Sequence, residues 1–282
     1  MILVPFGYML QQAAKGGYAI PAFNVVNMET IQAVVRAAEL EKSPLIVQLF
    51  REDLQFAGAD YMVAMTQVAA ANSSMPVALS LDHGHNFEQA KLCVDSGFSG
   101  VMIDLSSDDF DTNVRATQEV VAYAHERGVS VEAELGTIFD ADEPAEVRSS
   151  GMTDPEQARE FVLRTEVDAL AISIGTAHGL YSSTPKIDFA LAKTIVEKTP
   201  CPIVVHGGSN TPDDDIAELV RLGVSKINVG TDLVMAFNDG VIAAYEKNGR
   251  TAQLRDITRE GRDALIEMAR HKIQVFNRHR KV

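Results

Sequence analysis

Short hydrophobic runs rich in β-branched residues alternate along the chain with longer stretches whose apolar positions recur every three or four residues. The short runs predict strands and the longer stretches predict amphipathic helices. The predicted strands lie near Ile20–Phe23, Leu45–Leu49, Val77–Leu81, Val101–Ile103, Val129–Glu134, Ala169–Ile172, Ile203–Val205 and Ile227–Val229.

The helical stretches between these strands make the repeating unit a strand followed by a helix. They include Thr30–Lys42, Phe87–Ser96, Val114–Arg127, Pro155–Thr165 and Asp213–Leu222. Crossover helices imply parallel strands, and eight such units predict an α/β fold of the (β/α)8 TIM-barrel type. Tyr8–Lys15 is predicted to be a helix that closes the bottom of the barrel, and Thr258–Arg278 an extra helix that could pack on a partner subunit.

Length and composition predict a single domain spanning residues 1–282, because 46% hydrophobic content can fill one large core and no linker interrupts the chain. Neither a secretory leader nor an 18-residue apolar stretch is recognisable. We therefore expect a cytoplasmic protein whose Cys93 and Cys201 stay reduced. The net charge of −14 argues against binding to nucleic acid or anionic membranes, so an anionic substrate must be held by a local site.

Three histidines each follow a β-branched run and directly precede a glycine: His83, His178 and His206. They are too far apart in sequence for a zinc finger or a helical metal motif, but the ends of barrel strands would bring them together. Imidazoles bind zinc well, and catalytic zinc usually takes three protein ligands and keeps one position open. The pattern predicts a catalytic metal site.

Other polar residues also fall at the carboxyl ends of the predicted strands. Asn24, Gln48 and Asp82 belong to the first three strands, and Asp104 and Glu134 to the fourth and fifth. Asp104 and Glu134 have two interpretations, because each would serve either as a metal ligand or as a hydrogen-bond acceptor for a neighbouring histidine.

Glycines after the last two strands suggest a phosphate site. Gly207–Ser209 and Asn228–Thr231 lie where barrels often bind phosphate through backbone N–H groups, and Gly179 could add another. The alternative is that these segments are only tight turns.

Seven motifs, occurring in order at matching strand ends, resemble those of the class II ketose-bisphosphate aldolases, nearest the bacterial tagatose- and fructose-bisphosphate enzymes. The similarity runs from about residue 5 to 245. The motifs are Ala22–Asn24, Ser80–Gly84, Val101–Asp104, Val131–Gly136, Ile174–Gly179, Val205–Ser209 and Lys226–Val229.

The resemblance implies a reversible cleavage of a ketose (bis)phosphate, of the tagatose-1,6- or fructose-1,6-bisphosphate type, to dihydroxyacetone phosphate and an aldehyde. It implies one catalytic Zn²⁺ per subunit on His83, His178 and His206, with Asp104 and Glu134 at an alternative or neighbouring position, and Asp82 as the acid/base residue. A monovalent cation, Na⁺ or K⁺, often assists, and members are usually homodimers or homotetramers. We assign substrate binding to Asn24, Gln48, Gly179, Gly207, Gly208, Ser209, Asn228, Val229, Gly230 and Thr231.

The residues agree with this chemistry. A class I aldolase needs a Schiff-base lysine, whereas Lys226 is predicted at the beginning of its strand and so at the wrong end of the barrel. Zinc acting as a Lewis acid supplies the alternative electron sink.

The chain departs from the family pattern at several positions, most of them toward the part of the site that would bind the aldehyde. Asn210 replaces a glycine in the turn after Ser209, on the phosphate side, and asparagine tolerates the left-handed conformation that such a turn needs. The loop after the fifth strand lacks its usual two glycines, although Asp142 or Glu143 could still supply its carboxylate. Phe50 replaces a small polar residue, while Arg259 and Arg262 on the last helix could reach a partner's site to bind an anionic group or could simply be solvated. A catalytically degenerate barrel that binds a phosphosugar for regulation is the alternative function.

Overall fold

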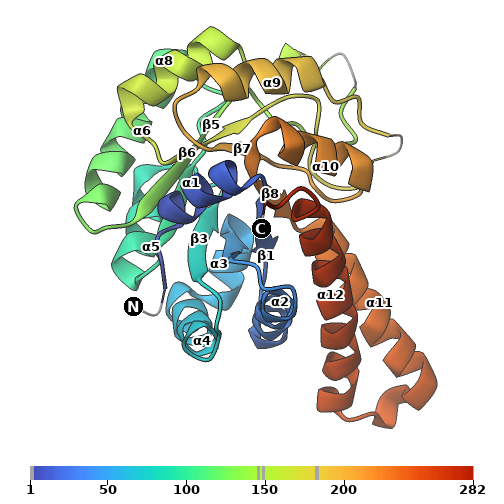
Figure 1. Cartoon of the computed structure of the whole chain (residues 1–282). Helices are drawn as coiled ribbons and strands as arrows, with labels where there is room; N and C mark the ends of the chain where they lie inside the picture. The colour runs from blue at the N-terminus through green and yellow to red at the C-terminus, as the bar shows by residue number, and fades with distance from the viewer. Residues whose placement is uncertain (1–2, 145–146, 148–149, 182–183, 282) are drawn as a thin grey trace.

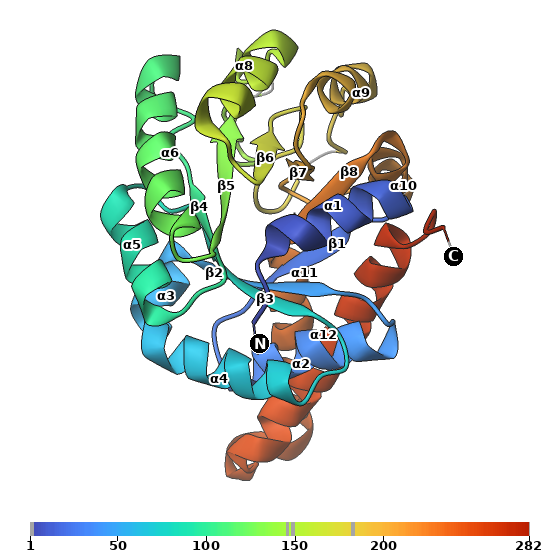
Figure 2. The same ribbon diagram turned by 60° about the vertical axis from the view of Figure 1, so that its left-hand side comes forward.

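Parallel strands form a closed barrel at the centre of the molecule and follow one another in chain order (Figures 1 and 2). In this computed structural model, which describes residues 3–144, 147, 150–181 and 184–281, the barrel has eight strands. The (β/α)8 fold predicted from the sequence is therefore confirmed. The strands are β1 (Ile20–Asn24), β2 (Leu45–Phe50), β3 (Val77–Asp82), β4 (Gly100–Ile103), β5 (Ser130–Leu135), β6 (Ala169–Ile172), β7 (Ile203–Val205) and β8 (Val224–Val229).

The clearest difference from the predicted strands is at β8, which begins at Val224 rather than Ile227. Lys226 pairs with Ile20 of β1, and Val224 pairs with Ile203 of β7, so both neighbours extend the ladder. The polar pair Ser225 and Lys226 hides this extension in the sequence, although both side chains are buried.

Helices surround the barrel and bury an apolar stripe against it (Figure 2). The predicted bounds are correct for three of them, but α2 and α6 begin earlier than expected. Asn27 and Asp109 cap these two helices by accepting hydrogen bonds from the backbone N–H groups of Thr30 and Thr112. The helices are α2 (Met28–Leu40), α3 (Arg51–Ala57), α4 (Ala59–Ala71), α5 (Phe87–Ser96), α6 (Phe110–His125), α8 (Pro155–Thr165), α9 (Phe189–Lys198) and α10 (Asp213–Leu222).

The amino-terminal helix α1 (Phe6–Gly16) closes one end of the barrel, as predicted (Figure 2). Phe6 and Leu10 are fully buried in a small core with inward-facing strand residues such as Ile20. Gly100 makes room for this plug, because a Cβ atom there would lie 2.4 Å from the Phe6 ring. The site must therefore lie at the other end.

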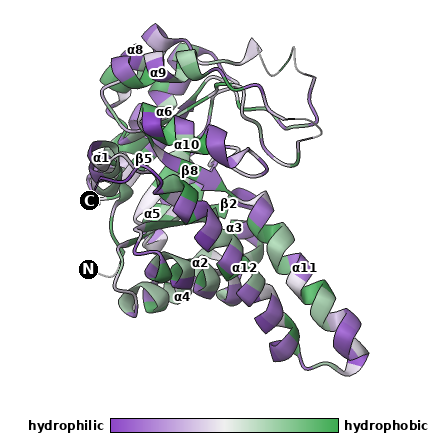
Figure 3. Ribbon diagram, turned by 45° about the vertical axis from the view of Figure 1, so that its right-hand side comes forward, coloured by the Kyte–Doolittle hydropathy of each residue, from purple (hydrophilic) through white to green (hydrophobic). Residues whose placement is uncertain are grey.

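The two carboxy-terminal helices form a hairpin that extends away from the barrel (Figures 1 and 3). It consists of α11 (Thr231–Asn248), a short 3₁₀ turn η1 (Gly249–Thr251) and α12 (Leu254–Phe276), which also packs on α2. Gly240 lets the helices approach closely, because a Cβ atom there would lie 2.5 Å from the carbonyl oxygen of Glu260. Within the part of the chain that the structure describes, no helix combines the length and apolarity needed to span a bilayer.

Candidate active site

A pocket of about 450 Å³ lies at the carboxyl ends of the strands. This is the size of a small-molecule site, at the barrel end where such sites are found. It is lined by Asn24, Phe50, Asp53, Asp82, His83, Asp140, His178, Gly179, His206, Gly207, Ser209, Asn228, Gly230, Thr231, Val234 and Met235.

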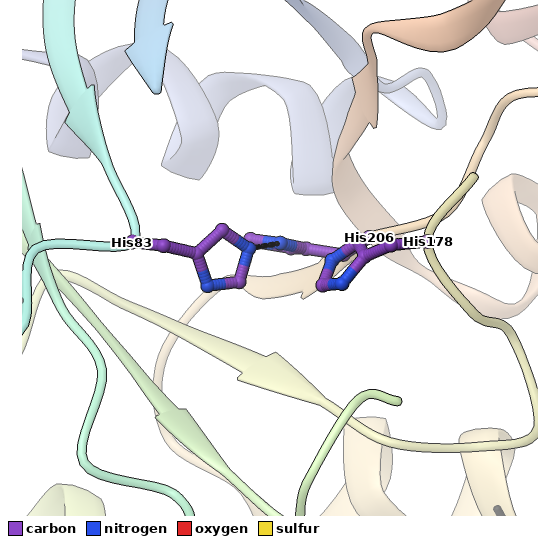
Figure 4. A group of neighbouring side chains, drawn as sticks. All are labelled: His83, His178 and His206. Carbon is purple, nitrogen blue, oxygen red and sulfur yellow. Dashed lines mark hydrogen bonds between the residues drawn. The ribbon is translucent and has the colours of Figure 1, made fainter. Parts of the chain in front are cut away.

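The structure brings the three predicted histidines together at this end (Figure 4). Nε2 of His83 lies 2.9 Å from Nδ1 of His206, and the His83 and His178 ring centroids are 4.8 Å apart. One nitrogen from each ring lies within 4.8 Å of the others. Imidazoles at this separation are suited to bind a single cation.

The glycine behind His83 allows the strand to turn there. His83 has a φ of 51°, which is uncommon for a residue with a side chain. A Cβ atom on Gly84 would lie 2.6 Å from the carbonyl oxygen of Met102, to which the Gly84 N–H donates a hydrogen bond. The turn aims the imidazole across the barrel mouth, and only glycine fits behind it.

Two of the histidines are held by carboxylates. Nδ1 of His83 lies 2.7 Å from Oδ2 of Asp104, and Nε2 of His206 lies 2.9 Å from Oε1 of Glu132. Because a carboxylate can only accept, each of these nitrogens carries the hydrogen, which leaves Nδ1 of His206 as an acceptor facing His83. Glu134 is close as well, with Oε2 3.8 Å from Nδ1 of His83.

The charges around the histidines place one positive charge on His83 and keep the other two rings neutral. Burial opposes protonation of His83, but Asp82, Asp104 and Glu134 raise its pKa to about 9. Burial and the charge on His83 lower the pKa of His178 to about 4, and they hold the pKa of His206 well below its usual value. Burial and the charge of Asp104 raise the pKa of Glu134 to about 8.

The donor set fits a divalent cation. Among the described residues, Nε2 of His178 and Oε2 of Glu134 are buried without any hydrogen-bond partner. Such atoms are costly unless they bind something. His83 also belongs to a second group with Asp104 and Glu134, whose ligand atoms are equally close, so both interpretations of these carboxylates agree with the geometry.

Asp82 lies beside the histidines and is held by two amides. Its Oδ2 accepts a hydrogen bond from Asn24 Nδ2 at 2.7 Å, and its Oδ1 accepts one from Asn228 Nδ2 at 3.1 Å. Burial alone would raise the pKa of this carboxyl, but His83, His206 and Lys226 lower it below its usual value. Asp82 is therefore an ionised carboxylate aimed into the pocket, able to accept a proton.

Lys226 lies deeper in the barrel than its predicted position at the beginning of a strand suggests. Its Nζ donates to Asn228 Oδ1 at 2.6 Å and lies 2.7 Å from Oε2 of Glu132. The contact with Asn228 turns that residue's N–H₂ group toward Asp82. Lys226 is completely enclosed and is not among the pocket-lining residues.

The loops after β7 and β8 form one wall of the pocket. Asn210 adopts the left-handed conformation expected of it, with a φ of 53°. Helix α11 begins at Thr231, and both Thr231 and the preceding Gly230 line the pocket, so the amino-terminal end of the helix lies beside it. This is the geometry of an anion site.

Five of the residues selected from the sequence do not line the pocket. Asp104 and Glu134 lie behind His83, and Gln48 is enclosed in β2. The remaining two are Gly208, where a Cβ atom would lie 2.6 Å from the Ile227 side chain, and Val229, which is buried in β8.

Four charged residues in or beneath the pocket were not selected from the sequence: Asp53, Glu132, Asp140 and Lys226. Glu132 was recognisable in principle, because it lies two residues before Glu134 on the same strand and therefore faces the same side of the sheet. Asp140, rather than Asp142 or Glu143, is the loop carboxylate that lines the pocket. The sequence carries no signal that distinguishes Asp140 from Asp142 and Glu143.

The chain is similar to known proteins in both sequence and structure. A family described as class-II fructose-bisphosphate aldolase matches residues 4–281. The YdjI aldolase from Escherichia coli K12 is 35% identical over 97% of both chains, with a TM-score of 0.86. A putative fructose-1,6-bisphosphate aldolase from Coccidioides immitis is 28% identical over 96% of both chains, with a TM-score of 0.82. A fructose-bisphosphate aldolase from Campylobacter jejuni shares the fold, with 24% identity over 98% of this chain and 95% of its own and a TM-score of 0.83.

Proposed function

The chain belongs to the class II fructose-bisphosphate aldolase family, and from that premise we propose that it reversibly cleaves a ketose phosphate to dihydroxyacetone phosphate and an aldehyde. The substrate is of the tagatose-1,6- or fructose-1,6-bisphosphate type. The observation that carries this proposal is the convergence of three histidine nitrogens beside an ionised, doubly hydrogen-bonded Asp82.

His83, His178 and His206 would hold one zinc ion per subunit. When bound, the zinc supplies a Lewis acid that stabilises negative charge developing on the substrate. Asp104 and Glu132 orient the His83 and His206 rings by accepting hydrogen bonds from the ring nitrogens that do not face the metal site, as carboxylates commonly do for metal-binding histidines.

Asp82 accepts the proton of the C4 hydroxyl as the bond between C3 and C4 breaks. The C4 oxygen then forms the aldehyde carbonyl, and the electron pair of the broken bond stays on C3, in the enediolate of dihydroxyacetone phosphate. Asn24 and Asn228 hold the Asp82 carboxylate in position for this transfer. Besides Asp82, two carboxylates line the pocket, Asp53 and Asp140, and we assign the return of a proton to C3 to Asp140.

The phosphate of dihydroxyacetone phosphate would bind to the β7 and β8 loops. Gly179, Gly207 and Gly230 allow close approach, and Ser209 and Thr231 supply hydroxyl donors. A monovalent cation, Na⁺ or K⁺, would assist there. The Ser209 and Thr231 hydroxyls lie beside the amino terminus of α11, where the helix dipole also favours an anion.

The chain would act as a homodimer or homotetramer in which the hairpin of α11 and α12 packs on a second copy. Val234, Met235, Ile242 and Tyr245 leave apolar surface exposed on α11. The hairpin extends beyond the barrel, where a neighbouring copy has access to it (Figure 3).

A panel of ketose phosphates tests the proposal. Dihydroxyacetone phosphate release should be found for at least one sugar, be abolished by chelation and return with zinc. His206→Ala should lose both bound zinc and activity, while the far-UV spectrum remains that of the wild type, because a barrel core of this size does not need a metal to fold. Full activity in metal-free protein would overturn the metal role, and phosphosugar binding without cleavage would favour a regulatory barrel.

A further inference from the structure

A buried ion pair lies behind the loops to which we assign the phosphate. It joins Asp232, at the start of α11, to Lys272 on α12, with Oδ2 and Nζ 2.6 Å apart. The two side chains are only 14% and 7% exposed, and neither residue lines the pocket. We propose that Lys272 is a positioning residue for phosphate binding, acting through Asp232; this inference rests on the proposed function.

Asp232 is tied to the β7 loop from both its side chain and its backbone. Both carboxylate oxygens accept a hydrogen bond from the Asn210 N–H, at 3.1 Å each, and the Asp232 N–H donates to Ser209 Oγ at 3.2 Å. Lys272 adds a third link, because its Nζ donates to the Gly208 carbonyl oxygen at 3.4 Å. The two residues of this ion pair thus contact three consecutive loop residues: their side chains reach Gly208 and Asn210, and the Asp232 backbone reaches Ser209.

These contacts determine which groups the loop presents to a ligand. Ser209 Oγ acts as acceptor for the Asp232 N–H, so its own hydroxyl hydrogen remains to be donated. Ser209 lines the pocket, while its partner Asp232 does not. The backbone contact therefore aims a hydroxyl donor at the ligand.

The charge of Lys272 is needed for a separate reason. A carboxylate placed directly behind a phosphate site repels the dianion that should bind there, and low exposure strengthens the repulsion. The Lys272 ammonium cancels the charge of Asp232 while leaving its acceptor oxygens in use. Removing the ammonium would leave an uncompensated carboxylate next to the pocket.

The neighbours of Lys272 on α12 make different contacts and supply a matched control. Arg270 Nε lies 2.8 Å from Glu41 Oε1, and His271 Nε2 lies 2.9 Å from Asp213 Oδ2. The Arg270 pair fastens the same helix to the carboxyl end of α2 without touching the loop. Arg270→Met thus reports what loss of an anchoring ion pair does by itself.

Binding of inorganic phosphate, dihydroxyacetone phosphate and unphosphorylated dihydroxyacetone should be measured by calorimetry for the wild type, Lys272→Met and Arg270→Met. Lys272→Met should bind both phosphates about 10- to 100-fold more weakly, a loss comparable to that of one hydrogen bond to a charged group. Its affinity for dihydroxyacetone should be unchanged, and in the aldolase assay KM should rise while kcat stays close to the wild-type value. Asp232→Asn combined with Lys272→Met should recover much of the lost phosphate affinity, because no unpaired carboxylate remains.

Wild-type phosphate affinity in folded Lys272→Met would overturn the proposal, and so would an equal loss in Arg270→Met or an equal loss of dihydroxyacetone binding. If Lys272→Met does not fold, Lys272→Gln tests the same loss of charge with a polar side chain. If the wild type cleaves no ketose phosphate, the proposed function is refuted but the positioning role is not. A selective loss of affinity for inorganic phosphate in Lys272→Met would still support that role. A wild type that binds no phosphate would refute that role.

Discussion

At the scale of single residues, the properties of Asp82 depend on its surroundings. The carboxyl is almost completely buried, yet His83, His206 and Lys226 keep its pKa low. Asn228 is oriented by Lys226 and holds one Asp82 oxygen, while Asn24 holds the other. A base whose position and charge are both fixed is suited to remove a hydroxyl proton.

Replacing Asp82 by alanine should therefore separate proton transfer from metal binding. We expect Asp82→Ala to bind zinc normally and to lose carbon–carbon cleavage by about 10²- to 10⁴-fold, the usual contribution of a general acid/base. Exchange of the C3 proton of bound dihydroxyacetone phosphate, followed by NMR in D₂O, should be less affected. Equal loss of cleavage and exchange would instead assign Asp82 a role in positioning the substrate.

Single residues also show how far the sequence could predict the site. His83, His178, His206 and Asp82 were recognisable because each lies at or beyond the end of a strand that had to reach the barrel mouth. Glu132 and Lys226 were not selected, because a charged residue in mid-strand gives no sign of which partner neutralises it until the barrel closes. The polar network beneath the site depends on contacts between β5, β8 and β3 that no local pattern records.

At the scale of elements, the segment after β5 is held against the segment after β6. The His178 N–H donates to the Phe139 carbonyl oxygen at 3.0 Å, and the Ala141 N–H donates to the His178 carbonyl oxygen at 2.8 Å. This pairing leaves Asp140 between two fixed residues, at the pocket wall. The sequence suggested Asp142 or Glu143 for the loop carboxylate, because no local pattern reveals that Asp140 forms a β-bridge with His178 on the neighbouring loop.

Asp140→Asn should consequently slow the exchange of the C3 proton by about 10²-fold or more, because the bound enediolate loses its acid/base partner. Asp142→Asn and Glu143→Gln serve as matched controls in the same NMR exchange assay and should change the rate much less. A larger effect of either control would indicate that the loop moves when substrate binds and brings a different carboxylate to C3.

Helix α12 carries the arginines considered for the aldehyde end. In this chain Arg259 pairs with Asp256 at 3.2 Å, and Arg262 donates to Gln32 at 3.3 Å. Neither lines the pocket of its own subunit, so any contact with substrate would be to the pocket of a second copy.

If such a contact exists, Arg259→Ala or Arg262→Ala should raise KM for an anionic aldehyde by about tenfold or more, as expected for loss of a charged hydrogen bond. Binding of dihydroxyacetone phosphate should be unchanged, because its phosphate would lie at the β7 and β8 loops. Steady-state kinetics in the synthesis direction measure both quantities. Unchanged kinetics in both variants would mean that the arginines are solvated surface residues.

At the scale of the whole molecule, the barrel was predictable and the hairpin was only partly so. Eight short apolar runs at regular intervals restrict the fold strongly, and all eight correspond to observed strands. The last helix was recognised, but its pairing with α11 was not. Only Leu233 and Ala244 of α11 are buried within this chain, so its apolar residues do not form the single buried stripe from which helix packing is predicted.

The exposed apolar side chains of α11 lead to a prediction about assembly. Ile242→Asp should lower the mass measured by sedimentation velocity, because a charge placed in an apolar contact between copies is costly to bury. Leu163→Asp on α8 is the matched control, since Leu163 is 55% exposed and Ile242 is 53% exposed. A wild-type mass for Ile242→Asp, or an equal decrease for Leu163→Asp, would contradict a role for the hairpin in assembly. If Arg259 or Arg262 also acts across the interface, the dissociated Ile242→Asp variant should reproduce the KM increase of the arginine variants while its zinc content stays normal, since His83, His178 and His206 all belong to one chain.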